Sequence, residues 1–167
     1  SLISSTKHGM LTMDKLGYKS DIVVQLSPTC PFIKIESISQ SIKYVINKDC
    51  DCAVSLKKIE HEHPYRARRL LKENFFENFI QDINVEEKSY HSRQDLPILY
   101  CTSGAIYTRK RHLLEKFDGA DFAMGNSRKG IIMDDIEAIN IDRTIDLEFA
   151  KFLLAQGIGE EYIKKNA

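Results

Sequence analysis

The stretch around which this chain is organised reads Asp21-Ile-Val-Val-Gln-Leu-Ser-Pro-Thr-Cys-Pro-Phe32. Its short apolar run predicts a buried strand that ends abruptly in a turn, because each proline removes a backbone donor and fixes φ. In open α/β sheets, ligands bind beyond the carboxyl ends of the strands. Residues 27–32 therefore lie where we expect a binding site, although the same stretch also suits a plain loop between a strand and a helix.

The bulk composition limits the classes of function to consider. A chain of 167 residues, 43% of them apolar, is long enough for one domain with a substantial core. Its 24 basic and 24 acidic residues balance, so the total charge does not support nucleic acid or an anionic membrane as a partner. The four cysteines are irregularly spaced, and no apolar run is long enough for a signal peptide or a membrane span. We therefore predict a reduced, cytoplasmic protein.

The first half of the chain alternates helical and strand patterns. Apolar residues recur at helical spacing on either side of the Asp21 strand, and Gly17 supplies a stop for the first helix. The predicted elements are a helix over residues 4–16, the strand from Asp21, a helix over 34–47 and a strand over 52–56. Strand, helix and strand in this order predict a right-handed parallel crossover, and hence an α/β fold with a mainly parallel sheet covered by helices.

The second half begins with an irregular segment and then returns to regular patterns. Between residues 61 and 96 the segment contains a basic cluster followed by phenylalanines, as is usual for a surface or partner contact. The elements predicted after it are a strand over 104–107, a short helix over 110–116, a strand over 130–133, an extended segment over 138–142 and a helix over 144–156. In the last helix we expect Ile145, Phe149, Phe152 and Leu153 to face inward.

Cysteines and histidines raise the question of a zinc site. Cys50-Asp-Cys52 and His61-Glu-His63 each place two ligand side chains on one face of an extended chain. Their spacing differs from that of the common zinc folds, so we interpret Cys52 as the start of a strand and the histidines as part of a polar turn. No cysteine has the flanking residues of an activated thiolate. Neither zinc binding nor cysteine chemistry is predicted.

Acidic and amide side chains crowd the approach to the last helix. They are Asp134, Asp135, Asn140, Asp142 and Asp146. Oxygen ligands at the end of an extended segment suit a Mg²⁺ ion that also carries the phosphates of a substrate. Equally, Asp142 or Asp146 can cap the helix and favour its positive end. Spacing alone leaves both interpretations open.

Six short motifs occur in a fixed order between residues 21 and 154. They are Ser27-Pro-Thr-Cys-Pro-Phe32, His63-Pro-Tyr65, Arg93-Gln-Asp-Leu-Pro97, Tyr100, Gly104-Ala-Ile-Tyr107, and Asn140-Ile-Asp142 with Asp146-Leu147. In this order and separation they resemble the acylneuraminate cytidylyltransferases, the CMP-sialic acid synthetase family. The resemblance implies a three-layer Rossmann-like nucleotide-sugar transferase sheet with helices on both faces. The implied reaction joins a 2-keto sugar acid to the cytidylyl group of CTP and releases pyrophosphate, with Mg²⁺ as cofactor.

The resemblance assigns roles to the turn after the first strand and to the acidic segment. Ser27 stands where the family has a glutamine. Gln25 lies two residues earlier, and on a strand its side chain points to the same face as that of Ser27. Both are therefore candidate substrate-binding residues. The family has two aspartates where this chain reads Asn140-Ile-Asp142. Asp142 keeps its carboxylate, and one carboxylate with phosphates suffices for Mg²⁺. We therefore expect Asp142 and Asn140 to hold the metal.

Further residues are assigned in the middle of the chain. Arg93, Gln94 and Tyr107 match the family, whose members hold the acidic sugar in this region, and Ser103 stands where the family has an asparagine. An arginine fork suits a sugar carboxylate. We therefore predict Arg93 and Asp142 as the catalytic residues, and Gln94, Ser103 and Tyr107 as substrate-binding residues.

The resemblance also explains the irregular segment. In the family the corresponding segment is an arm that packs on a second subunit, which implies one partial domain over residues 1–167 with residues 64–92 as a dimerisation arm. Arg66 stands where a basic residue reaches the site of the partner, and Phe75, Phe76 and Phe79 supply apolar contact area. We predict a homodimer. Alternatively, the three phenylalanines are buried beneath their own arm.

One feature of the family has no counterpart before Asp21. Family members begin with a strand and a glycine-rich basic loop, of the Arg-x-Gly-Ser-Lys kind, that wraps the triphosphate. Clustered amides and lysines stabilise charge on transferring phosphoryl oxygens, so the chain as given is expected to turn over CTP poorly. Two hypotheses follow: an N-terminally truncated cytidylyltransferase, or a non-catalytic dimerising or sugar-binding remnant of the family.

Overall fold

The computed structural model describes residues 1–48, 50–80, 92–160 and 162, which fall into two compact units. Unit 1 comprises Ser1–Lys57 and Thr102–Ala167, and unit 2 comprises Lys58–Cys101. Residues 81–91 of the predicted arm lie outside the described residues. No helix in the described part of the chain is both long and apolar enough to cross a membrane.

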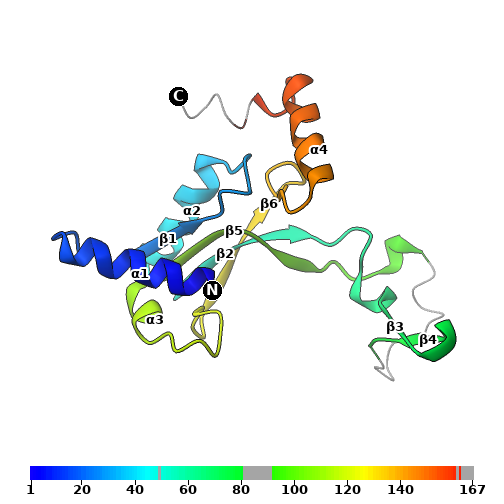
Figure 1. The fold of residues 1–167 in the computed structure, drawn as a ribbon, viewed down its shortest axis with the longest axis horizontal. Coiled ribbons are helices and arrows are strands. Elements are labelled where there is room, and N and C mark those ends of the chain that lie inside the picture. The colour runs from blue at the N-terminus through cyan, green and yellow to red at the C-terminus, as the bar shows by residue number, and fades with distance from the viewer. Residues whose placement is uncertain (49, 81–91, 161, 163–167) are drawn as a thin grey trace. The chain divides into compact units, whose positions relative to one another are not determined.

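Unit 1 is built on a four-stranded sheet with the order β1-β5-β2-β6 (Figure 1). The strands are β1 (Ile22–Leu26), β2 (Cys52–Lys58), β5 (Tyr100–Lys110) and β6 (Arg128–Met133). Strands β2 and β6 are parallel, whereas β1 and β5 are antiparallel. The Lys110 amide donates to the Asp51 carbonyl and the Ile106 amide to the Ser55 hydroxyl, so β5 also runs against β2.

The prediction of a mainly parallel sheet is therefore wrong. Helix α2 (Ile35–Ile46) connects β1 to β2, which run in the same direction, but β5 lies between these two strands. Strand β5 instead follows unit 2 in the chain without a crossover helix, and it pairs against both of its neighbours. The sheet is mixed.

Besides α2, the helices of unit 1 are α1 (Leu2–Lys15), α3 (Arg111–Glu115) and α4 (Thr144–Ala155). Three of them, α1, α2 and α3, pack against β1. Val23 packs in a cluster with Met10 of α1 and Leu114 of α3, whereas Ile22 packs in a cluster with Val45 of α2. Neighbouring residues of a strand point to opposite faces, so α1 and α3 lie on one side of β1 and α2 on the other.

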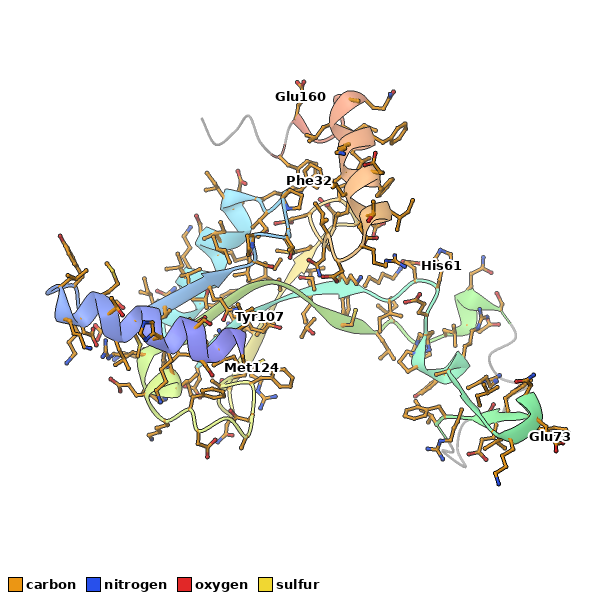
Figure 2. All side chains as sticks on the ribbon, in the orientation of Figure 1. Phe32, His61, Glu73, Tyr107, Met124 and Glu160 are labelled. Atoms are coloured by element: carbon orange, nitrogen blue, oxygen red, sulfur yellow. The ribbon has the colours of Figure 1, made fainter. Side chains whose placement is uncertain are left out.

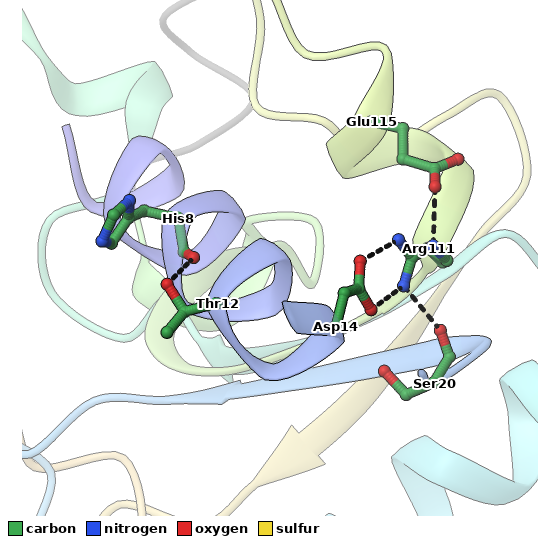
Figure 3. Close-up of polar contacts among 6 residues, drawn as sticks. All are labelled: His8, Thr12, Asp14, Ser20, Arg111 and Glu115. Carbon is green, nitrogen blue, oxygen red and sulfur yellow. Dashed lines mark hydrogen bonds and ion pairs between the residues drawn. The ribbon is translucent and has the colours of Figure 1, made fainter. Parts of the chain in front are cut away.

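Helix α1 is attached to α3 through Arg111 (Figure 3). The Arg111 guanidinium donates to both carboxylate oxygens of Asp14, one of them at 2.8 Å, and also to Glu115 and to the Ser20 carbonyl. The hydrogen bond from Arg111 holds the pKa of the Asp14 carboxyl below its usual range. The residues before β1 are thus a helix fixed to unit 1 by charge as well as by apolar contact.

The last helix buries other side chains than the sequence suggested. Leu153 packs in a cluster with Phe32, whose position Figure 2 labels, whereas Ile145, Phe149 and Phe152 are 64%, 51% and 54% exposed. Of the four residues expected to face inward, only Leu153 does. Apolar residues surround most of α4, so their spacing alone does not specify which stripe is buried.

The described residues of unit 2 form a short antiparallel hairpin and three single turns. The hairpin pairs β3 (Arg68–Leu70) with β4 (Phe76–Asn78), and the turns are η1 (Pro64–Arg66), η2 (Lys72–Asn74) and η4 (Arg93–Asp95). Phe75, Phe76 and Phe79 are 68%, 66% and 57% exposed. The alternative in which these phenylalanines are buried beneath their own arm is therefore wrong.

Candidate functional site

The turn after β1 lies against the segment that precedes α4. The backbone amide of Ile141 donates to the Thr29 carbonyl at 2.9 Å, and the Thr29 hydroxyl donates to the Asn140 side-chain oxygen at 2.6 Å. The carboxyl end of β1 and residues 140–142 thus form one continuous surface. This is where a ligand is expected in a sheet of this kind.

Four side chains on this surface are joined by hydrogen bonds, and we call them the Ser27–Asp142 chain. The Ser27 and Thr29 hydroxyls are 2.8 Å apart, Thr29 bonds to Asn140, and the Asn140 amide nitrogen donates to the Asp142 carboxylate at 2.7 Å. Thr29 and Asp142 are exposed, and Ser27 and Asn140 are partly buried. The structure therefore brings together three of the residues predicted from the sequence, Ser27, Asn140 and Asp142.

The acid that holds the start of α4 is Asp146. Its carboxylate accepts from the backbone amides of Arg143, at 2.8 Å, and Asp142, at 3.2 Å, and it pairs with the Arg143 guanidinium at 3.0 Å. The hydrogen bond from the Arg143 side chain keeps the pKa of Asp146 below its usual range. Since Asp146 performs the capping, the Asp142 carboxylate does not serve the helix.

Asp134 also has a structural role. Its carboxylate pairs with Lys34 at 2.5 Å, accepts from the Tyr162 hydroxyl at 3.1 Å, and accepts from the backbone amides of Ile136 and Glu137. These contacts close the turn that follows β6. Asp142 is the acid of the cluster whose side chain lies beside the carboxyl end of β1.

Asp142 and Asn140 supply too few ligand atoms to hold a metal ion by themselves. Among the described residues, no group of three or more His, Cys, Asp or Glu side chains is placed to hold an ion. Asp142 offers a carboxylate, and the Asn140 side-chain oxygen already accepts from Thr29. Mg²⁺ commonly combines one or two protein carboxylates with water and substrate phosphates. The pair therefore suits a Mg²⁺ that arrives with phosphates.

Gln25 is engaged away from the Ser27–Asp142 chain. Its side chain is only 8% exposed, and its oxygen accepts from the Thr6 hydroxyl at 3.0 Å and from Arg109 at 3.1 Å. The Arg109 guanidinium lies 4.6 Å from the centre of the Tyr107 ring. Gln25 and Tyr107, both predicted to bind substrate, thus adjoin a buried arginine on the side of the sheet that α1 covers.

Ser103 lies inside the sheet. It is 8% exposed, and its hydroxyl donates to the Ser55 hydroxyl at 2.7 Å and lies 3.5 Å from the Met133 sulfur. The structure does not bring Ser103 together with the Ser27–Asp142 chain.

The remaining predicted residues belong to unit 2. Arg66 is exposed in η1, and Arg93 and Gln94 belong to η4, where the Gln94 oxygen accepts from the Ser92 hydroxyl at 3.1 Å. The buried His63 joins two of the motifs, because one ring nitrogen lies 3.1 Å from the Pro97 carbonyl and the other accepts from the Tyr65 amide. Both ring nitrogens of His63 are thus used within unit 2.

Cys30 and Cys52, two of the four cysteines, are buried and unsuited to nucleophilic chemistry. Burial raises the pKa of the Cys52 thiol to about 11, and burial likewise raises the pKa of Cys30. A thiol of this kind stays protonated and unreactive at neutral pH.

Sequence reasoning missed Thr29 and Arg109. Thr29 stands inside the stretch quoted at the outset, and its signal was a second hydroxyl two residues after Ser27. Arg109 follows the Gly104-Ala-Ile-Tyr107 motif at the end of an apolar strand, where nothing local distinguishes a buried arginine from an exposed one.

Comparison with known proteins defines the class of fold. No protein-family model matches the sequence, and no curated protein matches it. Among solved structures, the chain is similar to a CMP:2-keto-3-deoxy-manno-octonic acid synthetase complexed with CTP. The TM-score is 0.60 at 13% sequence identity, and the match covers 94% of this chain and 69% of that chain. The protein therefore has a mixed α/β fold similar to that of this synthetase.

Proposed function

We propose that this protein is a cytidylyltransferase that activates a sialic-acid-like 2-keto sugar acid with CTP, giving a CMP-sugar and pyrophosphate. The observation that carries the proposal is the Ser27–Asp142 chain, at the carboxyl end of β1, in a fold similar to that of a synthetase solved with CTP. The proposal includes the three-layer Rossmann-like arrangement that the sequence resemblance implies.

The proposed roles follow from the chemistry of each side chain. Asp142 holds Mg²⁺, and Asn140 orients the Asp142 carboxylate through the 2.7 Å hydrogen bond from its NH₂ group. When bound, the ion would offset negative charge on the phosphoryl oxygens. Ser27 contacts the substrate at the end of β1. In unit 2, Arg93 binds the carboxylate of the sugar acid, and Arg66 assists from the partner subunit. The other candidates for substrate binding are Gln25, Gln94, Ser103 and Tyr107.

A second candidate is a non-catalytic sugar-binding or dimerising remnant. The observation that favours it is the exposure of Phe75 and Phe76 in unit 2, at 68% and 66%, because exposed aromatic side chains suit contact with a second subunit and need no bound nucleotide.

Binding and turnover measured together separate the two candidates. We expect residues 1–167 to bind CTP and a 2-keto sugar acid in calorimetric titrations, and to release pyrophosphate slowly. Adding a strand and a glycine-rich basic loop at the front is expected to raise the rate by about 100-fold, since such loops supply donors to the transferring phosphoryl group. Sialic acid and 2-keto-3-deoxy-octonic acid, compared as substrates, identify the sugar.

Each failure has a distinct meaning. Binding of the sugar acid without binding of CTP favours the remnant. Binding of neither ligand contradicts the cytidylyltransferase and the sugar-binding remnant, and leaves a dimerising remnant, which light scattering tests. Rapid pyrophosphate release by residues 1–167 alone contradicts the expectation of slow turnover and leaves the cytidylyltransferase proposal standing.

The proposal includes a homodimer formed through residues 64–92. Changing Phe75 and Phe76 together to Ser is expected to give monomers in light scattering, because two aromatic side chains that are 68% and 66% exposed lose their apolar contact with the partner. The matched control changes Phe149 and Phe152 of α4 to Ser. These are also about half exposed, at 51% and 54%, and the control is expected to stay dimeric.

Three results contradict the proposed interface. If the Phe75 and Phe76 variant stays dimeric, the arm is not the contact. If only the α4 control dissociates, the interface lies on α4. A wild-type protein that is monomeric at micromolar concentration rules out the dimer itself.

A further inference from the structure

In the Ser27–Asp142 chain, the donor and the acceptor of each hydrogen bond can be assigned, starting from Asp142. An ionised carboxylate has no proton to donate, so it accepts hydrogen bonds only. Asn140 must therefore turn its NH₂ group toward Asp142, and these atoms lie 2.7 Å apart. The side-chain oxygen of Asn140 consequently faces Thr29, at 2.6 Å. The thiol of Cys30, 3.7 Å from the same oxygen, is a second donor that agrees with this orientation.

The same reasoning identifies the donor in the hydrogen bonds of the Thr29 and Ser27 hydroxyls. A threonine hydroxyl carries one proton, and Thr29 gives that proton to Asn140. In the 2.8 Å contact between Thr29 and Ser27, the donor must then be Ser27. The proton of Ser27 is thereby committed to the protein, and its oxygen presents only lone pairs to a ligand.

We propose that Ser27 selects a substrate hydroxyl as an obligatory hydrogen-bond acceptor, and that Thr29 and Asn140 are positioning residues that fix this polarity. The inference rests on the proposed function, which supplies the substrates. Phosphate and carboxylate oxygens carry no proton at neutral pH, so the lone pairs of Ser27 repel them. A hydroxyl of the substrate is therefore held at the end of β1, and the anionic groups of CTP and of the sugar acid are held elsewhere.

The hydroxyl has two possible sources, which deoxy ligands distinguish. One source is the ribose of CTP and the other is the sugar acid. The measured quantity is the discrimination ratio, the Kd of a ligand that lacks one hydroxyl divided by the Kd of the complete ligand. One set of titrations uses CTP, 2′-deoxy-CTP and 3′-deoxy-CTP, and the other uses the sugar acid and its single-deoxy derivatives.

The variants test both the acceptor and its polarity. Ser27→Ala is expected to weaken the complete ligand by about 10-fold and to bring the ratio close to 1, because one hydrogen bond is lost and the deoxy ligand never made it. Thr29→Val removes the partner that holds the Ser27 hydroxyl in place, so the Ser27 lone pairs are no longer fixed toward the ligand, and the ratio is expected to fall although the Ser27 oxygen is kept. Thr29→Ser keeps the hydroxyl and is expected to keep the wild-type ratio.

Melting temperatures recorded on the same variants identify a purely structural role for Thr29. Such a role lowers the melting temperature in Thr29→Val but leaves the ratio unchanged, and that result overturns the inference. A ratio near 1 for every deoxy ligand in the wild type also overturns it, while the proposed function stands as long as CTP and the sugar acid bind. If neither ligand binds, the proposed function and the inference fall together.

Discussion

Asp142→Asn is expected to lower Mg²⁺-dependent pyrophosphate release by about 100-fold or more, because a neutral amide cannot offset the charge of a divalent ion as a carboxylate does. The fold is expected to survive. The side chain is exposed, and an Asn oxygen at this position can still accept the hydrogen bond from the Asn140 amide. The melting temperature should therefore change by less than about 2 °C. Turnover is measured in the form of the protein with a glycine-rich loop restored, and binding of Mn²⁺ by electron paramagnetic resonance gives a readout that does not need turnover.

The matched control is Asp146→Asn, four residues along the same segment. Asp146 caps α4 and pairs with Arg143, so its loss is expected to lower the melting temperature and to leave Mn²⁺ binding near the wild-type level. The two variants should thus have opposite profiles. If Asp142→Asn keeps near-wild-type turnover at limiting Mg²⁺, the metal is held elsewhere, with Asp134 and Asp135 as the next candidates.

Local signals predicted most elements of unit 1. An apolar run closed by prolines predicted β1, and apolar residues on one face predicted α2, whose observed range, Ile35–Ile46, lies within the predicted residues 34–47. The signals that succeeded depend on residues close together in the sequence. Proline geometry and helical periodicity act over a few positions, so one sequence is enough to detect them.

Features that depend on distant partners were not predicted. Strand β5 has eleven residues where four were expected, and Gly104 within it has a φ of 79°, which interrupts the alternation of buried and exposed side chains. The buried stripe of α4 depends on the position of Phe32, more than a hundred residues earlier. No local pattern carries this information.

In the candidate site too, the local motifs were predicted and the contacts between distant residues were not. The end of β1 and Asn140-Ile-Asp142 were predicted as parts of a site, each from its own motif. The polarity of the Ser27–Asp142 chain depends on a contact between Thr29 and Asn140, which are 111 residues apart. Gln25 was predicted to act with Ser27, yet its oxygen is held by Arg109 and Thr6, two partners that strand alternation cannot reveal.

The second large effect is expected at Arg109, which is 1% exposed. Its guanidinium donates to the side-chain oxygen of Gln25 at 3.1 Å and to the carbonyls of Ala123, at 3.1 Å, and Phe122, at 3.4 Å. All three acceptors are neutral, and burial lowers the pKa of Arg109. This arginine therefore attaches the loop that contains Phe122 and Ala123 to the sheet.

Arg109→Met is expected to lower the free energy of unfolding by about 2 kcal/mol, or about 6 °C in melting temperature, since it keeps the apolar stem but leaves buried carbonyl oxygens without a donor. Avoiding the desolvation of a buried charge offsets part of this loss. The matched control is Lys110→Met, which also removes one positive charge, but from a partly buried pair with Asp51, with side chains 28% and 29% exposed, that contributes about 1 kcal/mol. Hydrogen exchange should speed up at Phe122 and Ala123 in the Arg109 variant alone. Equal melting temperatures for the two variants would mean that desolvation of the guanidinium cancels its three hydrogen bonds, and Arg109 would then not be what holds this loop.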